Sequence, residues 1–192
     1  MKTFLKTIIL TSSLFLLTGC SQKVEFSQNY IEANVKKDLK KVNTEEVDIK
    51  KNENLYLKKH PNGFRGSAST LDINLGSLNE NVLREFSAQY FNQVSVVPGL
   101  TDNLYIESKF YNYEYAYGFS DGNEVEVFVE MKVFYKNKLI LEKKYNMKND
   151  IAALTLNFSI APLVQENFHK ALLKLYETKF KPDLLRALEN NK

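Results

Sequence analysis

Hydrophobic and polar residues alternate through the middle of the chain with a period of two, which is typical of a half-buried strand. The longest alternation places six residues on one face: Val125, Val127, Val129, Met131, Val133 and Tyr135. Residues 104–118 and 139–147 are the expected neighbouring strands, and polar turn residues at 120–123 and 136–138 separate the three. The pattern therefore predicts a three-stranded antiparallel meander.

Two other stretches repeat apolar residues with the period of a helix. The first follows an expected strand at 69–75, and Ser77-Leu78-Asn79-Glu80 at its start matches a capping box. Its stripe comprises Val82, Leu83, Phe86, Tyr90, Phe91 and Val94. The second helix is expected to begin near Pro162 and to end at Pro182, before a short helix at 183–188. Its stripe comprises Val164, Phe168, Ala171, Leu172, Leu175 and Tyr176.

These elements predict an α+β fold with an antiparallel sheet and two amphipathic helices packed on one face. The expected order is strand, helix, three-stranded meander and C-terminal helix. Residues 53–192 form the expected single domain, and the polar residues 20–52 before it are expected to be a tether. This length agrees with the roughly 100 to 200 residues of an ordinary domain.

The first nineteen residues have the pattern of an export signal, with Lys2 and Lys6 ahead of an apolar run at 8–17. That run is about half as long as the roughly 20 residues of a membrane-spanning helix. Leu17, Thr18, Gly19 and Cys20 resemble the lipobox of bacterial lipoproteins, in which the peptide is cut before an acylated cysteine. The resemblance implies that Cys20 carries a diacylglycerol and an N-acyl chain. A cleaved secretory signal without acylation is the alternative.

The composition offers little support for catalysis or for nucleic-acid binding. Without Lys2 and Lys6, 24 basic residues face 23 acidic ones, and this balance gives no reason to expect a nucleic-acid partner. Neither His60 nor His169 has the spacing of a metal site, and both are expected to be solvated. Nucleophile-elbow, P-loop and dinucleotide motifs are missing from the sequence. We therefore expect no enzyme, no metal and no cofactor beyond the acyl chains.

A tyrosine-rich stretch at 105–119 is the candidate binding surface. A strict period of two places Tyr105 on the same side as four further tyrosines, which are the candidate partner or ligand residues: Tyr111, Tyr113, Tyr115 and Tyr117. Tyrosine rings with polar rims suit a binding surface. The more common alternative is that they cover cross-strand neighbours. A shared face with Phe128 and Phe134 would favour a partner-binding patch.

The order of lipobox, polar tether, strand, capped helix, meander and C-terminal helix resembles that of YajG-like outer-membrane lipoproteins. It is also similar to that of auxiliary lipoproteins of ABC-type lipid transporters. Residues 104–176 carry the likeness, through a hairpin with polar turns that leads by way of 145–150 into a helix.

The leading hypothesis is a non-catalytic accessory lipoprotein, bound to the outer membrane by its lipid anchor and facing the periplasm. Ser21 after the cysteine favours this membrane by resemblance to known sorting signals. The expected partner is an envelope protein in assembly or lipid transport. The alternative is a lipid- or glycan-binding module that uses the tyrosine strand or a helix–sheet groove, and an envelope hydrolase is less favoured.

Overall fold

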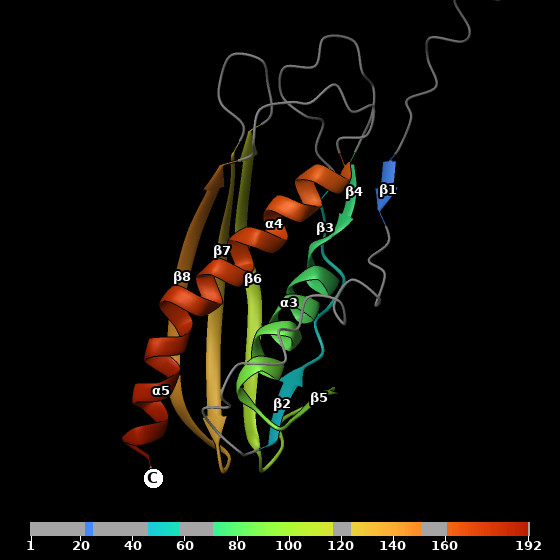
Figure 1. Cartoon of the computed structure of the whole chain (residues 1–192). Helices are drawn as coiled ribbons and strands as arrows, with labels where there is room; N and C mark the ends of the chain where they lie inside the picture. The colour runs from blue at the N-terminus through green and yellow to red at the C-terminus, as the bar shows by residue number, and fades with distance from the viewer. Residues whose placement is uncertain (1–21, 25–45, 58–70, 117–123, 151–160, 192) are drawn as a thin grey trace, which may run out of the picture.

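The computed structural model describes residues 22–24, 46–57, 71–116, 124–150 and 161–191. Its main sheet lies behind a layer of helices, and a smaller sheet lies near one end of it (Figure 1). The main sheet has the order β5-β2-β6-β7-β8, from strands Gln93–Val97, Glu46–Lys50, Leu104–Ala116, Glu124–Tyr135 and Lys138–Asp150. The smaller sheet has the order β1-β4-β3, from strands Gln22–Val24, Leu71–Asn74 and Tyr56–Leu57.

Strands β6, β7 and β8 form the expected antiparallel meander. Alternate residues of β7 are buried, as the period of two predicts. Lys136 and Asn137 join β7 to β8 with φ angles of 50° and 61°, the left-handed conformation of a two-residue hairpin turn. The other expected turn, at 120–123, lies outside the described residues.

The prediction of a purely antiparallel sheet is wrong, because β2 pairs in parallel with both β5 and β6. Strand β2 lies between β5 and β6 in the sheet, and its Val47 and Ile49 are fully buried. Residues 46–50 had been placed in the polar tether, as had β1, which pairs with β4. Only two apolar residues mark β2, too few for a period of two to be recognised.

The first helix, α3, spans Leu75–Tyr90 and begins earlier than its sequence indicates. Its N-cap is Asn74, whose Oδ1 accepts the backbone N–H of Ser77 at 3.2 Å. The expected capping box is therefore wrong. Glu80 accepts the backbone N–H of Asn52 at 2.9 Å and so fastens the chain before β3 to the helix.

The C-terminal helix continues past Pro182, which is contrary to prediction. Helix α4 (Ala161–Leu175) runs into a π-helical turn, η1 (Tyr176–Phe180), and then into α5 (Lys181–Glu189). In the wide turn the N–H of Lys181 bonds to the carbonyl of Tyr176, five residues back. Pro182 then occupies the first turn of α5, where its missing N–H costs little.

The core lies between the helices and the inner face of the main sheet (Figure 1). Phe86 of α3 contacts Tyr176 and Phe180 of η1 through ring pairs 5.7 and 5.9 Å apart. These contacts join α3 to the C-terminal helical run. Within the described residues, no helix combines the length and the apolar composition needed to span a membrane.

Candidate functional site

The lipobox residues Leu17, Thr18, Gly19 and Cys20 lie outside the described residues, as do Tyr117 and His60. Acylation of Cys20 therefore stays a prediction. The three other candidate tyrosines and His169 can be placed in the structure.

A β-bulge divides the tyrosine stretch, so the prediction that its tyrosines share one side is wrong. The register of β6 against β7 shifts between Phe110 and Asn112. An extra residue reverses which face each later side chain occupies. Tyr111 lies on the outer face, which is the sheet face opposite the helices, and its ring centroid is 5.9 Å from that of Phe128. Tyr113 instead packs against Phe168 of α4 at 6.4 Å.

The tyrosines therefore have different roles. Tyr113 and Tyr115 are partly buried against the core, and burial raises the pKa of Tyr115 to about 12. Tyr105 is fully buried beside Phe134. Among the three candidate tyrosines that the structure describes, only Tyr111 is exposed, with 47% of its surface accessible. The core tyrosines agree with the structural alternative, and Tyr111 remains a candidate for binding.

Lys144 of β8 lies against the ring of Tyr111 on the outer face. The Lys144 Nζ lies 4.9 Å from the Tyr111 ring centroid and 3.8 Å from Glu130. The lysine side chain is 61% exposed, whereas that of Glu130 is 27% exposed. Lys148 is likewise 57% exposed, and it lies 3.2 Å from Glu124 and 3.8 Å from Glu126, whose side chains are 44% and 12% exposed. We call Tyr111, Phe128, Lys144 and Lys148 the outer-face patch.

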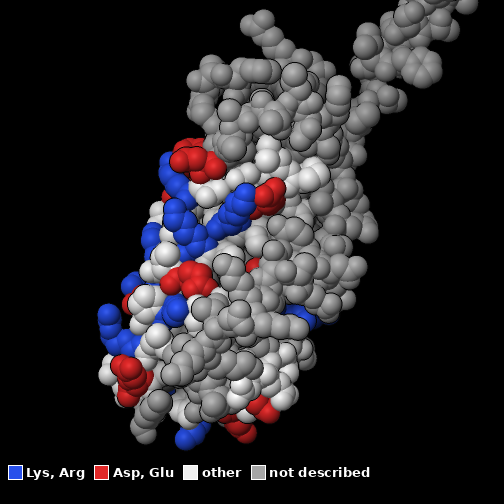
Figure 2. Space-filling model, in the orientation of Figure 1, with Lys and Arg blue, Asp and Glu red and all other residues white. Residues whose placement is uncertain are grey.

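The helix side also carries charges of both signs. Figure 2 shows basic and acidic side chains intermingled over α4 and α5. Surface pairs there include Lys170 and Glu166, 2.6 Å apart and similarly exposed. Such a surface presents no single sign of charge to a partner.

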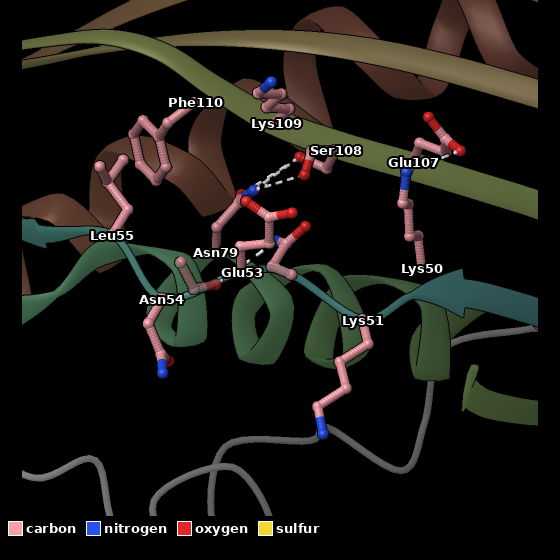
Figure 3. A pocket seen from close by; sticks show the side chains of 12 residues that line it. Lys50, Lys51, Glu53, Asn54, Leu55, Asn79, Glu107, Ser108, Lys109 and Phe110 are labelled. Atoms are coloured by element: carbon pink, nitrogen blue, oxygen red, sulfur yellow. Dashed lines mark hydrogen bonds and ion pairs between the residues drawn. The ribbon is translucent and has the colours of Figure 1, made fainter. Parts of the chain in front are cut away.

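A pocket of about 230 Å³ lies where β2 and β6 diverge. The two strands pair only up to Ile49 and Ile106, after which residues 50–55 turn away from β6. The beginning of α3 closes the gap between them (Figure 3). The lining residues come from all three segments: Lys50, Lys51, Asn52, Glu53, Asn54, Leu55, Gly76, Asn79, Glu107, Ser108, Lys109 and Phe110.

Two buried polar side chains of the pocket lining, Asn79 and Ser108, are held in place by hydrogen bonds to each other and to Tyr176. Asn79 Nδ2 donates to the Ser108 hydroxyl at 2.9 Å and to its carbonyl at 3.2 Å. The Tyr176 hydroxyl donates to Asn79 Oδ1 and lies 2.8 Å from the Ser108 hydroxyl. Burial raises the pKa of Tyr176 well above its usual value, and the Ser108 bond opposes this only in part. The network therefore joins α3, β6 and η1 through neutral groups.

The remaining lining has a polar part and an apolar part. In Figure 3 the Glu53 side chain points towards Asn79 and Ser108, while Leu55 and Phe110 lie beside each other. The amines of Lys51 and Lys109 point away from the centre. The sequence does not predict this site, because its lining residues come from three segments far apart in the chain and share no motif.

His169 is buried, contrary to the prediction of a solvated residue. It is 6% exposed, and its Nε2 lies 2.7 Å from Oε2 of Glu85, which is 3% exposed. The pair joins α4 to α3. Helical periodicity does not predict this burial, because His169 lies on the flank of α4 beside its apolar stripe, and that flank packs against α3. Among the described residues, no group of three acidic, histidine or cysteine side chains is placed to hold a metal ion.

Comparisons with known proteins identify a shared fold. No family model matches the sequence, and no curated protein matches it. A Xanthomonas campestris protein described by the family model DUF330 has a TM-score of 0.56 at 10% identity, over 90% of this chain and 98% of that one. A candidate lipoprotein from Caulobacter crescentus CB15 has a TM-score of 0.45 at 10% identity, over 61% and 85% of the two chains. The chain thus has the fold of the DUF330 protein.

Proposed function

We propose that the protein is a non-catalytic lipoprotein that docks onto an envelope protein while anchored to the outer membrane through Cys20. The single observation that supports docking most directly is the outer-face patch. Its exposed Tyr111 lies on the side of the sheet that the described helices leave open. Tyr111 packs against the Phe128 ring. Tyrosines are among the residues that contribute most of the binding energy at protein interfaces.

The charges around Tyr111 indicate the kind of partner. Lys144 lies against the Tyr111 ring, and its side chain is more exposed than that of Glu130, the carboxylate 3.8 Å from it. A partner with an acidic residue beside a pocket for the Tyr111 ring would be complementary to the Tyr111–Lys144 pair, which favours both the association rate and the correct orientation. The proposed role in envelope assembly or lipid transport comes from the resemblance of the sequence to accessory lipoproteins.

The absence of catalysis in this proposal rests on the sequence, which has none of the nucleophile or phosphate-binding motifs that were sought. The periplasmic face of the outer membrane is proposed from the lipobox and Ser21. The Caulobacter lipoprotein has too low a TM-score to add to this.

Docking can be tested by crosslinking in intact cells followed by recovery of the full-length protein from membranes. Tyr111→Ala and Lys144→Glu should each reduce recovery of an acidic partner about tenfold or more, as expected for the loss of roughly 1.4 kcal/mol or more. Lys170→Glu is the matched control, because Lys170 is an exposed lysine of α4 with 56% of its side chain accessible. Equal recovery with all three variants would overturn the proposed surface.

A further inference from the structure

The walls of the pocket beside β6 are held in place before any ligand arrives. Asn52 is bonded to Glu80, as described above, and the Leu55 carbonyl accepts the N–H of Leu75 at 2.7 Å. On the opposite side, Ser108 is fixed by Asn79. A ligand that enters this pocket would therefore not have to order its walls, which lowers the entropic cost of binding.

The size and charge of the pocket exclude several ligand classes. Its volume of about 230 Å³ lies below the roughly 300–1,000 Å³ of pockets for drug-sized ligands. A long acyl chain would leave the Glu53 carboxylate without water or a hydrogen-bond partner. An anion would meet the Glu53 carboxylate, while the Lys51 and Lys109 amines point elsewhere (Figure 3). Lys50 is already paired with Glu107 at 3.2 Å.

The remaining arrangement suits a small ring with a hydroxylated edge and an apolar face. Glu53 offers two acceptor oxygens, and the Asn52 side-chain amide, which also lines the pocket, offers a donor and an acceptor. Leu55 and Phe110 provide the apolar side of the same pocket. We propose that this pocket binds one ring of a neutral glycan, with the ring hydroxyls towards Glu53 and the carbon face towards Leu55 and Phe110.

This inference goes beyond the docking function and does not depend on it. The pocket lies between β6 and residues 50–55, whereas Lys144 and Lys148 of the outer-face patch belong to β8. Loss of glycan binding would leave the docking surface intact, and loss of docking would leave the pocket intact.

The test is an NMR titration of the full-length protein, labelled with ¹⁵N and purified in detergent. The probes are methyl β-D-glucopyranoside, N-acetylglucosamine and, as a small cation, ethanolamine. We expect at least one sugar to shift the amide signals of Asn79 and Ser108 saturably, with a Kd of about 1–10 mM, while that of Lys144 stays unchanged. No saturable shift at about 100 mM of either sugar would overturn the proposal.

Variants of Glu53 separate a sugar from a cation as the preferred ligand. Glu53→Gln keeps a side-chain oxygen acceptor and should weaken sugar binding less than about threefold, whereas Glu53→Ala should weaken it about tenfold. Glu142→Ala, at an outer-face glutamate with 47% of its side chain exposed, is the matched control and should bind normally. Saturable binding of ethanolamine that Glu53→Gln abolishes, without sugar binding, would contradict the glycan assignment. The wild-type titration remains decisive if a variant does not fold.

Discussion

Gly76 lies where α3 passes closest to the chain that precedes β3. A Cβ atom at this position would be 2.0 Å from the backbone oxygen of Glu53 and 3.1 Å from its carbonyl carbon. Backbone atoms cannot move aside as a flexible side chain can. Gly76→Ala should therefore lower the free energy of unfolding by about 1–3 kcal/mol, measured by urea denaturation.

Gly99 provides the control for this substitution. A Cβ added there meets no atom within 4 Å. Gly99→Ala should change the free energy of unfolding by less than about 0.5 kcal/mol. If both alanine variants are equally stable, α3 does not approach Glu53 as closely as the structure indicates.

The buried pair of His169 and Glu85 is a second test at the scale of single residues. Replacement of either one removes a hydrogen-bond partner from a group that is almost inaccessible to water. His169→Ala and Glu85→Ala should each cost about 2–3 kcal/mol, and the double variant should cost less than their sum. Denaturation of all four proteins of this double-mutant cycle measures the coupling energy.

The exposed pair of Glu166 and Lys170 is the control for that cycle, because its oxygen and nitrogen atoms are similarly close, at 2.6 Å. Solvent screens this pair, so its coupling energy should be about 0.3–0.5 kcal/mol. Additive effects at His169 and Glu85 would contradict a direct interaction between them.

At the scale of elements, Asp183 fastens α5 to β8. Its Oδ2 accepts a hydrogen bond from Lys143 Nζ at 2.7 Å and another from the Tyr145 hydroxyl at 2.8 Å. The Lys143 bond is the main reason that the pKa of Asp183 lies below its usual value, and the Tyr145 bond acts in the same direction. The charged carboxylate is thus favoured in the folded protein.

Protonation of Asp183 should consequently weaken the fold in acid. A lowered folded-state pKa contributes stability above the unfolded value of about 3.9, and this contribution is lost as the pH falls through the folded value. Asp183→Asn should cost about 1 kcal/mol at pH 7, since Lys143 is exposed, and should reduce the loss of stability below about pH 4. Glu189→Gln, at an exposed residue of α5, is the control. Its free energy of unfolding should match that of the wild type both at pH 7 and below about pH 4. An unchanged pH profile for Asp183→Asn would contradict this role.

The regular elements were predictable because each carries a long repeat of its own. Six alternating residues identify β7, and the two apolar stripes identify α3 and α4. Strand β2 has only Val47 and Ile49, and their burial is decided by strands β5 and β6, which follow more than forty residues later. Local sequence could therefore not show that β2 is a strand or that it runs parallel to its neighbours.

The candidate sites were less predictable because they too depend on contacts between distant parts of the chain. The bulge at Tyr111 depends on how β6 pairs with β7, and neither Gly nor Pro marks it in the sequence. It separates Tyr111 from Tyr113, which a strict alternation had placed together. The pocket depends on where residues 50–55 leave β6, so Asn79 and Ser108 meet only in the folded chain.

At the scale of the whole molecule, the proposed anchor predicts where the protein is found in the cell. Cys20→Ser removes the proposed attachment site of the acyl chains. Because stable attachment requires two or more such chains, most of the protein should leave the membrane fraction. Ser21→Ala is the control and should leave the protein in that fraction. Immunoblots of separated membrane and soluble fractions measure both results. Membrane retention of Cys20→Ser would count against attachment by lipid alone.

Pairing of β1 with β4 has a mechanical consequence for the anchored protein. Gln22 is the first described residue and is paired, so the described part of the smaller sheet begins two residues after Cys20, a reach of about 7 Å. A flexible chain of about thirty residues would instead span about 30 Å and would let the domain rotate freely. With Cys20 acylated as proposed, the smaller sheet is held at the bilayer surface. The end of the molecule that carries α5 and the C-terminus then projects away from it (Figure 1).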